Sequence, residues 1–270
     1  MDNLKFFLGI GLAIVLVFFA ASVYTRFAGD TAVPVDDETL YQVSTIDALM
    51  QGVFDGILPV GDLKTHGDFG IGTFDALDGE MIVIDGVVYQ AKADGHIYRV
   101  SDSLTTPFAT VTYYDRDFSN MTGNPMNFTV FSSSMGEGLP SQNMVYAVHM
   151  HGTFPIMKVR AIPAQSKPYP NLTVAAQNQA VFIYTNTTGS VVGFYTPVFF
   201  DGLNVVGFHL HFISDDRQTG GHILDFIVPK NTLVEYDITP EFHMILPTSG
   251  AFTGADLSQD LTVELAKIEK

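Results

Sequence analysis

Three histidines, His209, His211 and His222, have a spacing that could bind a metal ion. Side chains two positions apart on a strand point to the same face, so His209 and His211 would project together. The flanking residues are rich in strand formers, and the polar segment between them ends in Gly220-Gly221, which predicts a β-hairpin. A loop over residues 215–218 would place His222 opposite His211, on the same face of the hairpin.

Three neutral imidazoles suit zinc or another divalent transition metal. Zinc with three protein ligands and an open fourth position is a common catalytic arrangement. The chain has no cysteine, which excludes thiolate ligands and disulfides. A second His-x-His pair, His149 and His151, has no third histidine that would face it across a tight hairpin. We therefore assign the other histidines to structural roles: His66, His96, His149, His151 and His243.

Composition limits the classes of function. The chain has 270 residues, of which 47% are hydrophobic, so it is long and apolar enough to form a large core. Its formal net charge of −16 argues against nucleic acid as a partner, because phosphates need a basic surface. A small anionic substrate would need a locally positive site, here a metal ion and an arginine.

The N-terminus carries an uncharged, mostly apolar stretch over residues 6–25, between Lys5 and Arg26. Its length is sufficient to span a bilayer as a helix and exceeds the apolar core of most cleaved signals. We expect residues 1–26 to form an apolar helix that is a signal peptide or a membrane anchor. The protein would then be exported, and either secreted or anchored to the outer face of the cytoplasmic membrane. Residues 27–40 are expected to be a polar linker.

The remaining chain, residues 41–270, predicts an α+β fold. We expect predominantly antiparallel or mixed β-sheets in two packed β-rich halves, with a few short helices and a subdivision near residues 163–172. Asp85-Gly86 and Asp94-Gly95 are typical of hairpin turns. Helices are predicted after a capping Ser44 or Thr45, near 173–181 and over 256–269. Separate strands are predicted at 145–154, 156–162, 181–184 and 190–195.

The hairpin sequence from Gly207 to Leu224 resembles the signature of the α-acetolactate decarboxylases. Other stretches that match this family in the same order are 41–50, 70–81, 168–172 and 193–197. The resemblance covers about residues 40 to 270 and implies a carboxy-lyase that converts 2-acetolactate to acetoin. The expected partner is this small molecule, with membrane contact through the N-terminal segment; a homodimer is a further expectation.

The resemblance also implies four site residues. Glu80 and Arg160 match the family's catalytic glutamate and arginine, and Glu269 matches a second glutamate, with Glu264 as the alternative. Thr73 matches a threonine that lines the substrate site. The planar guanidinium of an arginine can hold a carboxylate, and a glutamate whose pKa is raised by burial can relay a proton.

Such a site would work without an organic cofactor. 2-Acetolactate has a ketone beside a tertiary hydroxyl, and both oxygens could chelate one metal ion. Loss of CO2 would leave an enediolate, which a cation stabilises, and protonation of its carbon would yield acetoin. Two alternatives stay open. One is a cupin-like metal-dependent oxygenase, because Asp215 follows His211 at a spacing that loosely matches that family; the other is a non-enzymatic exported domain with structural zinc.

Overall fold

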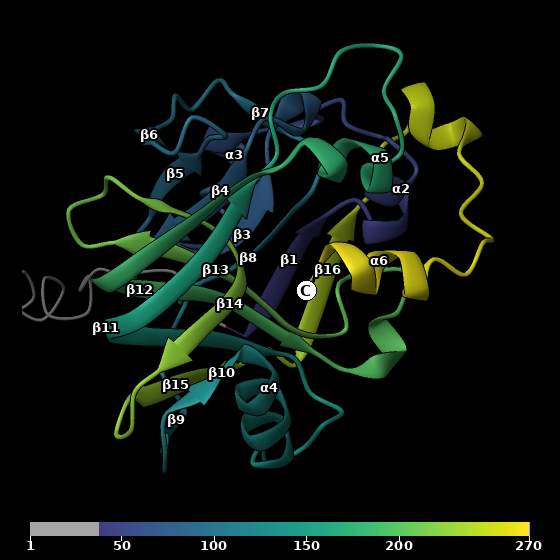
Figure 1. The fold of residues 1–270 in the computed structure, drawn as a ribbon. Helices are drawn as coiled ribbons and strands as arrows, with labels where there is room; N and C mark the ends of the chain where they lie inside the picture. Colours follow the sequence, from purple (N-terminus) through teal and green to yellow (C-terminus); the bar gives the residue numbers. More distant parts are fainter. Residues whose placement is uncertain (1–37, 270) are drawn as a thin grey trace, which may run out of the picture. The chain divides into compact units, whose positions relative to one another are not determined.

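The structure is a computed structural model that describes residues 38–269 (Figure 1). The predicted N-terminal helix and most of the predicted linker lie outside the described residues. Within residues 38–269, no helix is long and apolar enough to cross a membrane. The structure contains one chain, so the expected homodimer stays a prediction.

The first of two seven-stranded sheets contains the N-terminal strands and one strand from the C-terminal region. Its spatial order is β16 (Glu241–Ile245), β1 (Thr39–Val43), β8 (Ala109–Thr112), β3 (Phe69–Thr73), β4 (Glu80–Ile84), β5 (Val87–Ala91) and β6 (Ile97–Arg99). Its pairings are antiparallel except the parallel pair of β1 and β16. The predicted turn at Asp85-Gly86 joins β4 to β5, with positive φ at both residues.

The second sheet carries the predicted histidine hairpin. Its order is β10 (Met126–Asn127), β14 (Gly220–Val228), β13 (Gly207–Ser214), β12 (Ala180–Thr196), β11 (Tyr146–Ala161), β15 (Leu233–Ile238) and β9 (Phe118–Met121). Strand β14 pairs with β11 as well as with β13, so strands β11 to β14 close on themselves. A small third sheet pairs β2 (Leu58–Pro59) with β7 (Thr105–Thr106).

Strands β11 and β12 are longer than predicted, because each runs through a point where the sequence pattern breaks. In β11, the register continues from Phe154 opposite Thr187 to Ile156 opposite Thr185, and the proline between them is left without a partner. The change from one sheet to the other falls in the connections at 113–117 and 239–240. It therefore does not coincide with the predicted subdivision near 163–172.

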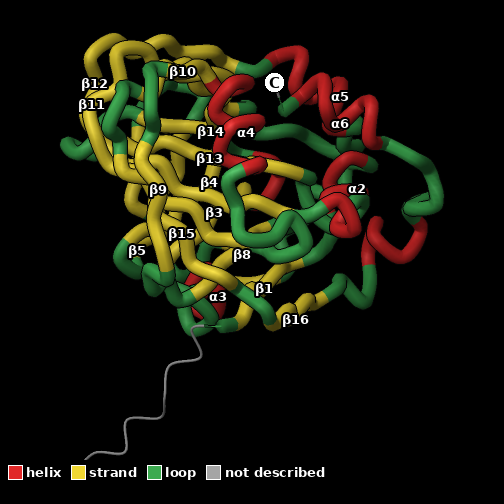
Figure 2. The backbone as a smooth tube through the Cα atoms, turned by 90° about the horizontal axis from the view of Figure 1, so that it is seen from below, coloured by secondary structure: helices red, strands yellow, loops and turns green. Residues whose placement is uncertain are grey.

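The helices are short, as predicted. They are α2 (Ile46–Met50), α3 (Val60–Leu63), α4 (Phe128–Glu137), α5 (Leu172–Ala175) and α6 (Thr262–Ile268), with 3-10 turns η1 (Asp75–Leu77), η2 (Ala176–Asn178), η3 (Val198–Phe200) and η4 (Gly250–Gly254). Helices α2, α5 and α6 gather on one side of the sheets (Figure 2). The side chain of Thr45 caps α2, as expected.

The C-terminal helix is shorter than the predicted 256–269. Residues before Thr262 form turns instead, in which the Asp256 side chain accepts hydrogen bonds from the backbone N–H and hydroxyl of Ser258. Such local side-chain to backbone bonds compete with helix formation, so the helix begins only at Thr262.

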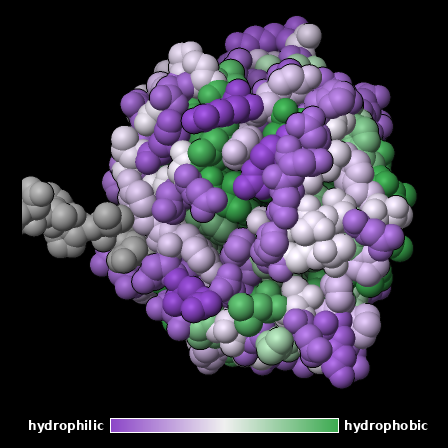
Figure 3. Space-filling model, turned by 90° about the vertical axis from the view of Figure 1, so that its left-hand side faces the viewer, coloured by the Kyte–Doolittle hydropathy of each residue, from purple (hydrophilic) through white to green (hydrophobic). Residues whose placement is uncertain are grey.

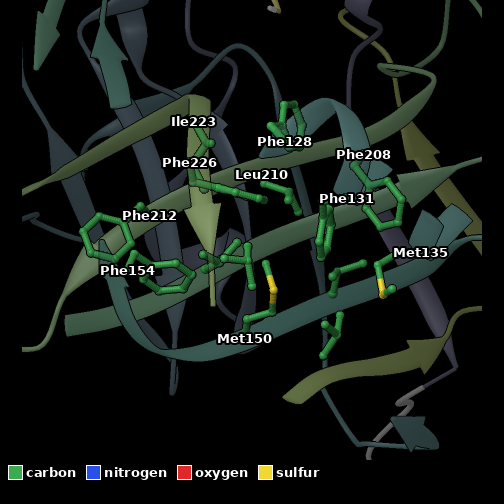
Figure 4. Packing of buried hydrophobic residues seen from close by; sticks show 14 of the residues in the cluster. Phe128, Phe131, Met135, Met150, Phe154, Phe208, Leu210, Phe212, Ile223 and Phe226 are labelled. Carbon is green, nitrogen blue, oxygen red and sulfur yellow. The ribbon is translucent and has the colours of Figure 1, made fainter. Parts of the chain in front are cut away.

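The largest apolar core lies on the side of the hairpin away from the histidines (Figure 4). It contains Phe208, Leu210 and Phe212 of β13, which alternate along the strand with His209 and His211. A second buried cluster joins residues of both large sheets, among them Phe69 of β3 and Phe194 of β12. The view in Figure 3 shows a largely hydrophilic surface with patches of hydrophobic residues. The predominantly β fold with short helices is thus confirmed.

Candidate metal centre

The hairpin of β13 and β14 has the predicted register. His211 lies opposite His222, and the N–H of Ser214 donates to the carbonyl of Thr219 at 2.9 Å. All three histidines are buried, and one ring nitrogen from each lies within 4.8 Å of the others. The ring centroids are 5.0 to 5.3 Å apart. The rings therefore converge on one point.

The protonation and hydrogen bonding of the ring nitrogens are suited to binding a metal ion. Nδ1 of His211 donates a hydrogen bond of 2.8 Å to the carbonyl of Met81, which leaves Nε2 with its lone pair. Within residues 38–269, Nε2 of His211 and Nε2 of His222 are buried without a hydrogen-bond partner. Burial, aided by Arg160, lowers the pKa of His209 to about 3, and burial also lowers the pKa of His211 and His222. Neutral, unpartnered imidazoles are the form that binds zinc and related metals.

Two glutamates and an arginine from three other elements complete the buried cluster. Arg160 of β11 donates from Nη1 to Oε1 of Glu80 at 3.1 Å and from Nη2 to Oε1 of Glu269 at 3.2 Å. Glu80 begins β4, and Glu269 directly follows α6. Glu264, the alternative to Glu269, is not among the residues that line the pocket described below.

Each glutamate directs its second oxygen towards the imidazoles. Oε2 of Glu269 is 3.5 Å from Nε2 of His222 and 3.7 Å from Nε2 of His209, and Oε2 of Glu80 is 3.8 Å from Nε2 of His211. These separations are too long for hydrogen bonds. Arg160 thus holds both carboxylates at the point where the three histidines meet.

Burial controls the charge of the two glutamates. It raises the pKa of Glu80 to about 7, with Arg160 opposing the rise and Glu269 adding to it. Burial also raises the pKa of Glu269, again opposed by Arg160. A carboxyl group with a pKa near neutrality can both donate and accept a proton, as acid–base catalysis requires.

A small pocket opens onto this cluster. His209, His211, Glu80, Arg160 and Glu269 line it. The rest of its wall is mainly apolar and comes from several elements: Ile46, Leu49, Leu77, Phe108, Ile162 and Leu172. None of these apolar residues was among the site residues predicted from the sequence. These residues belong to elements that are far apart in the sequence, so no local sequence pattern indicates that they line one pocket.

Thr73 also lines the pocket, but its hydroxyl already has a partner. It donates a hydrogen bond of 2.7 Å to the carbonyl of Gly79, next to Glu80. Two of the remaining histidines have hydrogen-bond contacts with carboxylates elsewhere, His149 with Glu235 and His151 with Asp215. Asp215, which suggested a cupin-like ligand set, is therefore beside His151 at the hairpin tip and outside the group of converging ring nitrogens.

Known proteins are similar to this chain in fold and in sequence. The crystal structure of alpha-acetolactate decarboxylase from Bacillus subtilis superposes with a TM-score of 0.81 at 33% identity, over 86% of this chain and 98% of that one. The alpha-acetolactate decarboxylase of Methanosarcina mazei is 51% identical over 233 residues, which are 86% of this chain and 81% of the relative. That of Methylococcus capsulatus is 42% identical over 225 residues, or 83% of this chain and 86% of the relative.

These similarities place the chain in the class of carboxy-lyase enzymes. The family model for alpha-acetolactate decarboxylase matches residues 40–259. The chain belongs to the alpha-acetolactate decarboxylase family.

Proposed function

We propose that this protein decarboxylates 2-acetolactate to acetoin in the pocket above the three histidines, with a divalent transition metal, zinc foremost, held by His209, His211 and His222. The observation that carries the proposal is the convergence of three buried, neutral imidazoles with two glutamates bridged by one arginine. When bound, the metal would supply a Lewis acid that draws electron density from the substrate oxygens.

The chain's own residues would bind and orient the substrate. Nε of Arg160 is buried and without a hydrogen-bond partner among the described residues, while its two Nη atoms are occupied by Glu80 and Glu269. Its N–H is therefore a donor available to a substrate oxygen. The apolar wall would accommodate the substrate's methyl groups and exclude water, which strengthens the electrostatic interactions inside the pocket.

The reaction requires one proton. When the C–C bond to the carboxylate breaks, CO2 leaves. The electron pair of that bond passes into the adjacent ketone. The resulting carbanion equivalent must then receive a proton on carbon to become acetoin. Glu80, whose pKa is raised to about 7, and Glu269, whose pKa is also raised, are suited to hold that proton next to the substrate.

A structural zinc site would have its ligands closed off from any cavity, whereas His209 and His211 line the pocket. The test is to measure CO2 and acetoin from 2-acetolactate together with the metal content of the protein. His222→Ala should lose both metal and activity. His151→Ala, a histidine paired with Asp215, is the matched control and should keep both. Full activity in a metal-free His222→Ala protein would refute the proposal, and oxygen consumption would favour the oxygenase instead.

We also propose that residues 1–26 export the chain as a signal peptide or hold it at the membrane as an anchor. The uncharged apolar stretch at 6–25 supports this. Intact mass measured on protein from the membrane and from the medium would distinguish cleavage from anchoring, and full-length protein confined to the cytoplasm would exclude both.

A further inference from the structure

The turn that leads into Glu80 has a strained backbone. It spans residues 74–79 between β3 and β4, which pair antiparallel with Thr73 opposite Glu80. Ala76 and Leu77, in succession, both have left-handed φ angles, of 60° and 59°. This conformation is unfavourable for residues with a Cβ, and it persists only where the surrounding structure holds it. The contacts of the turn therefore decide its shape.

The shape of the turn matters because two of the residues that follow the bend line the pocket. Leu77 is 3% exposed and Glu80 is 7% exposed, and both side chains form part of the pocket wall. The carboxyl group of Glu80 accepts hydrogen bonds from Arg160 and from the backbone N–H of Ile162. The N–H of Gly79 in turn donates to the carbonyl of Ile162 at 2.9 Å. A shift of the turn by about 1 Å would therefore displace the Glu80 carboxyl group from its donors and from the substrate.

Gln90 of β5 holds this turn from the neighbouring strand. Strand β5 pairs with β4 beside the turn, with Ala91 opposite Glu80 and Gln90 opposite Met81 (Figure 1). Gln90 is 7% exposed, and its Nε2 donates to the carbonyl of Asp78 at 2.6 Å. The bond fixes the peptide that directly follows the left-handed pair and lies two residues before Glu80. Without this donor the partly buried carbonyl would need another partner, and the turn would have to move to provide one.

We propose that Gln90 is a positioning residue for Glu80, acting through its hydrogen bond to the carbonyl of Asp78. Gln90 is not among the residues that line the pocket, and its amide neither gains nor loses a proton in the reaction. It sets the geometry of the carboxyl group before the substrate binds, which lowers the entropy lost in reaching the transition state. The inference rests on the proposed decarboxylation, in which Glu80 holds a proton beside the substrate.

Gln90→Leu tests the inference, because it keeps the approximate size of the side chain and removes the donor. In the metal-loaded protein it should lower kcat for 2-acetolactate by about 10- to 10²-fold, with KM changed less than about twofold. Metal content, measured by elemental analysis, should equal that of the wild type. Gln42→Leu is the matched control, since Gln42 is fully buried and its Nε2 donates to the carbonyls of Ser44 and Leu203. Both variants should lose Tm, but Gln42→Leu should keep its kcat.

A double-mutant cycle separates positioning from a general loss of structure. In a Glu80→Gln background, Gln90→Leu should lower kcat by less than about twofold, because the group that Gln90 positions is already altered. Gln90→Met, whose flexible side chain fills the same space without a donor, gives the same measurements if Gln90→Leu does not fold. A wild-type kcat in either folded, metal-loaded Gln90 variant, or an equal loss in the Glu80→Gln background, would overturn the inference. A wild type that releases no CO2 from 2-acetolactate would instead refute the proposed function itself.

Discussion

Arg160 of β11 lies directly opposite His222 of β14, and a β-bulge is the reason. On one side of the bulge Lys158 pairs with Asp225, and on the other Val159 pairs with Ile223. Continued without the bulge, the register would pair Arg160 with Ile223, whose side chain belongs to the large apolar core. The extra residue, Leu224 of β14, therefore turns His222 to the face of the sheet on which Arg160 lies.

The first prediction concerns the planar guanidinium. Arg160→Lys should lower kcat/KM by about 10²-fold, because one ammonium cannot hold Glu80 and Glu269 in the same geometry as the two Nη atoms. Bound metal, measured by elemental analysis, should remain. Arg116→Lys makes the same change in an exposed ion pair and should leave the kinetics unaltered. Wild-type kinetics in Arg160→Lys would remove Arg160 from the reaction.

The second prediction concerns the pH dependence of metal affinity. In the metal-free protein the pKa of Glu80 is raised to about 7, and the charge of a bound cation would lower that pKa, so metal binding below pH 7 is coupled to partial release of the Glu80 proton. Affinity should rise between pH 5 and 7, by up to tenfold per pH unit, and level off above pH 7. The histidines contribute little to the change of metal affinity with pH in this range, because the pKa of His209 is lowered to about 3 and those of the other two are also lowered.

Glu80→Gln tests this assignment. The variant should bind metal more weakly but with a flatter pH dependence, and Glu269, whose pKa is also raised, would account for any remaining slope. Competition with a chelator at several pH values measures both quantities. An unchanged slope in Glu80→Gln would show that the proton is displaced from another group.

The third prediction concerns the close approach of β14 to β11. Gly221, next to His222, has φ +146°, and a Cβ there would lie 2.5 Å from the carbonyl oxygen of Arg160. Gly221→Ala should therefore destabilise the protein by roughly 1–3 kcal/mol and reduce metal content. Urea unfolding and elemental analysis measure the two effects. Gly152→Ala on β11 is the control, since a Cβ there meets nothing within 4 Å. Equal stability of the two variants would contradict the argument.

The histidine hairpin could be predicted because its signals are local. The spacing of His209 and His211 defines one face of a strand, and the loop over 215–218 determines which residue lies opposite. The prediction of two separate strands was wrong at Pro155. Strand β11 pairs with β12 on both sides of this proline and therefore continues through it. The C-terminal helix was overpredicted, because the polar turn at Asp256 competes with it.

The sequence by itself determined the β-rich class and the three converging histidines, since alternation and short spacing act within one hairpin. From the residues alone, Glu80, Arg160 and Glu269 could have been ordinary surface or ion-pair residues, and the family resemblance pointed to them. Only the tertiary structure joined Arg160 to partners 80 and 109 residues away, and only it placed Gln90 against the turn before Glu80. Burial and the pKa shifts it causes depend on which distant strands pack together, and no local pattern encodes that.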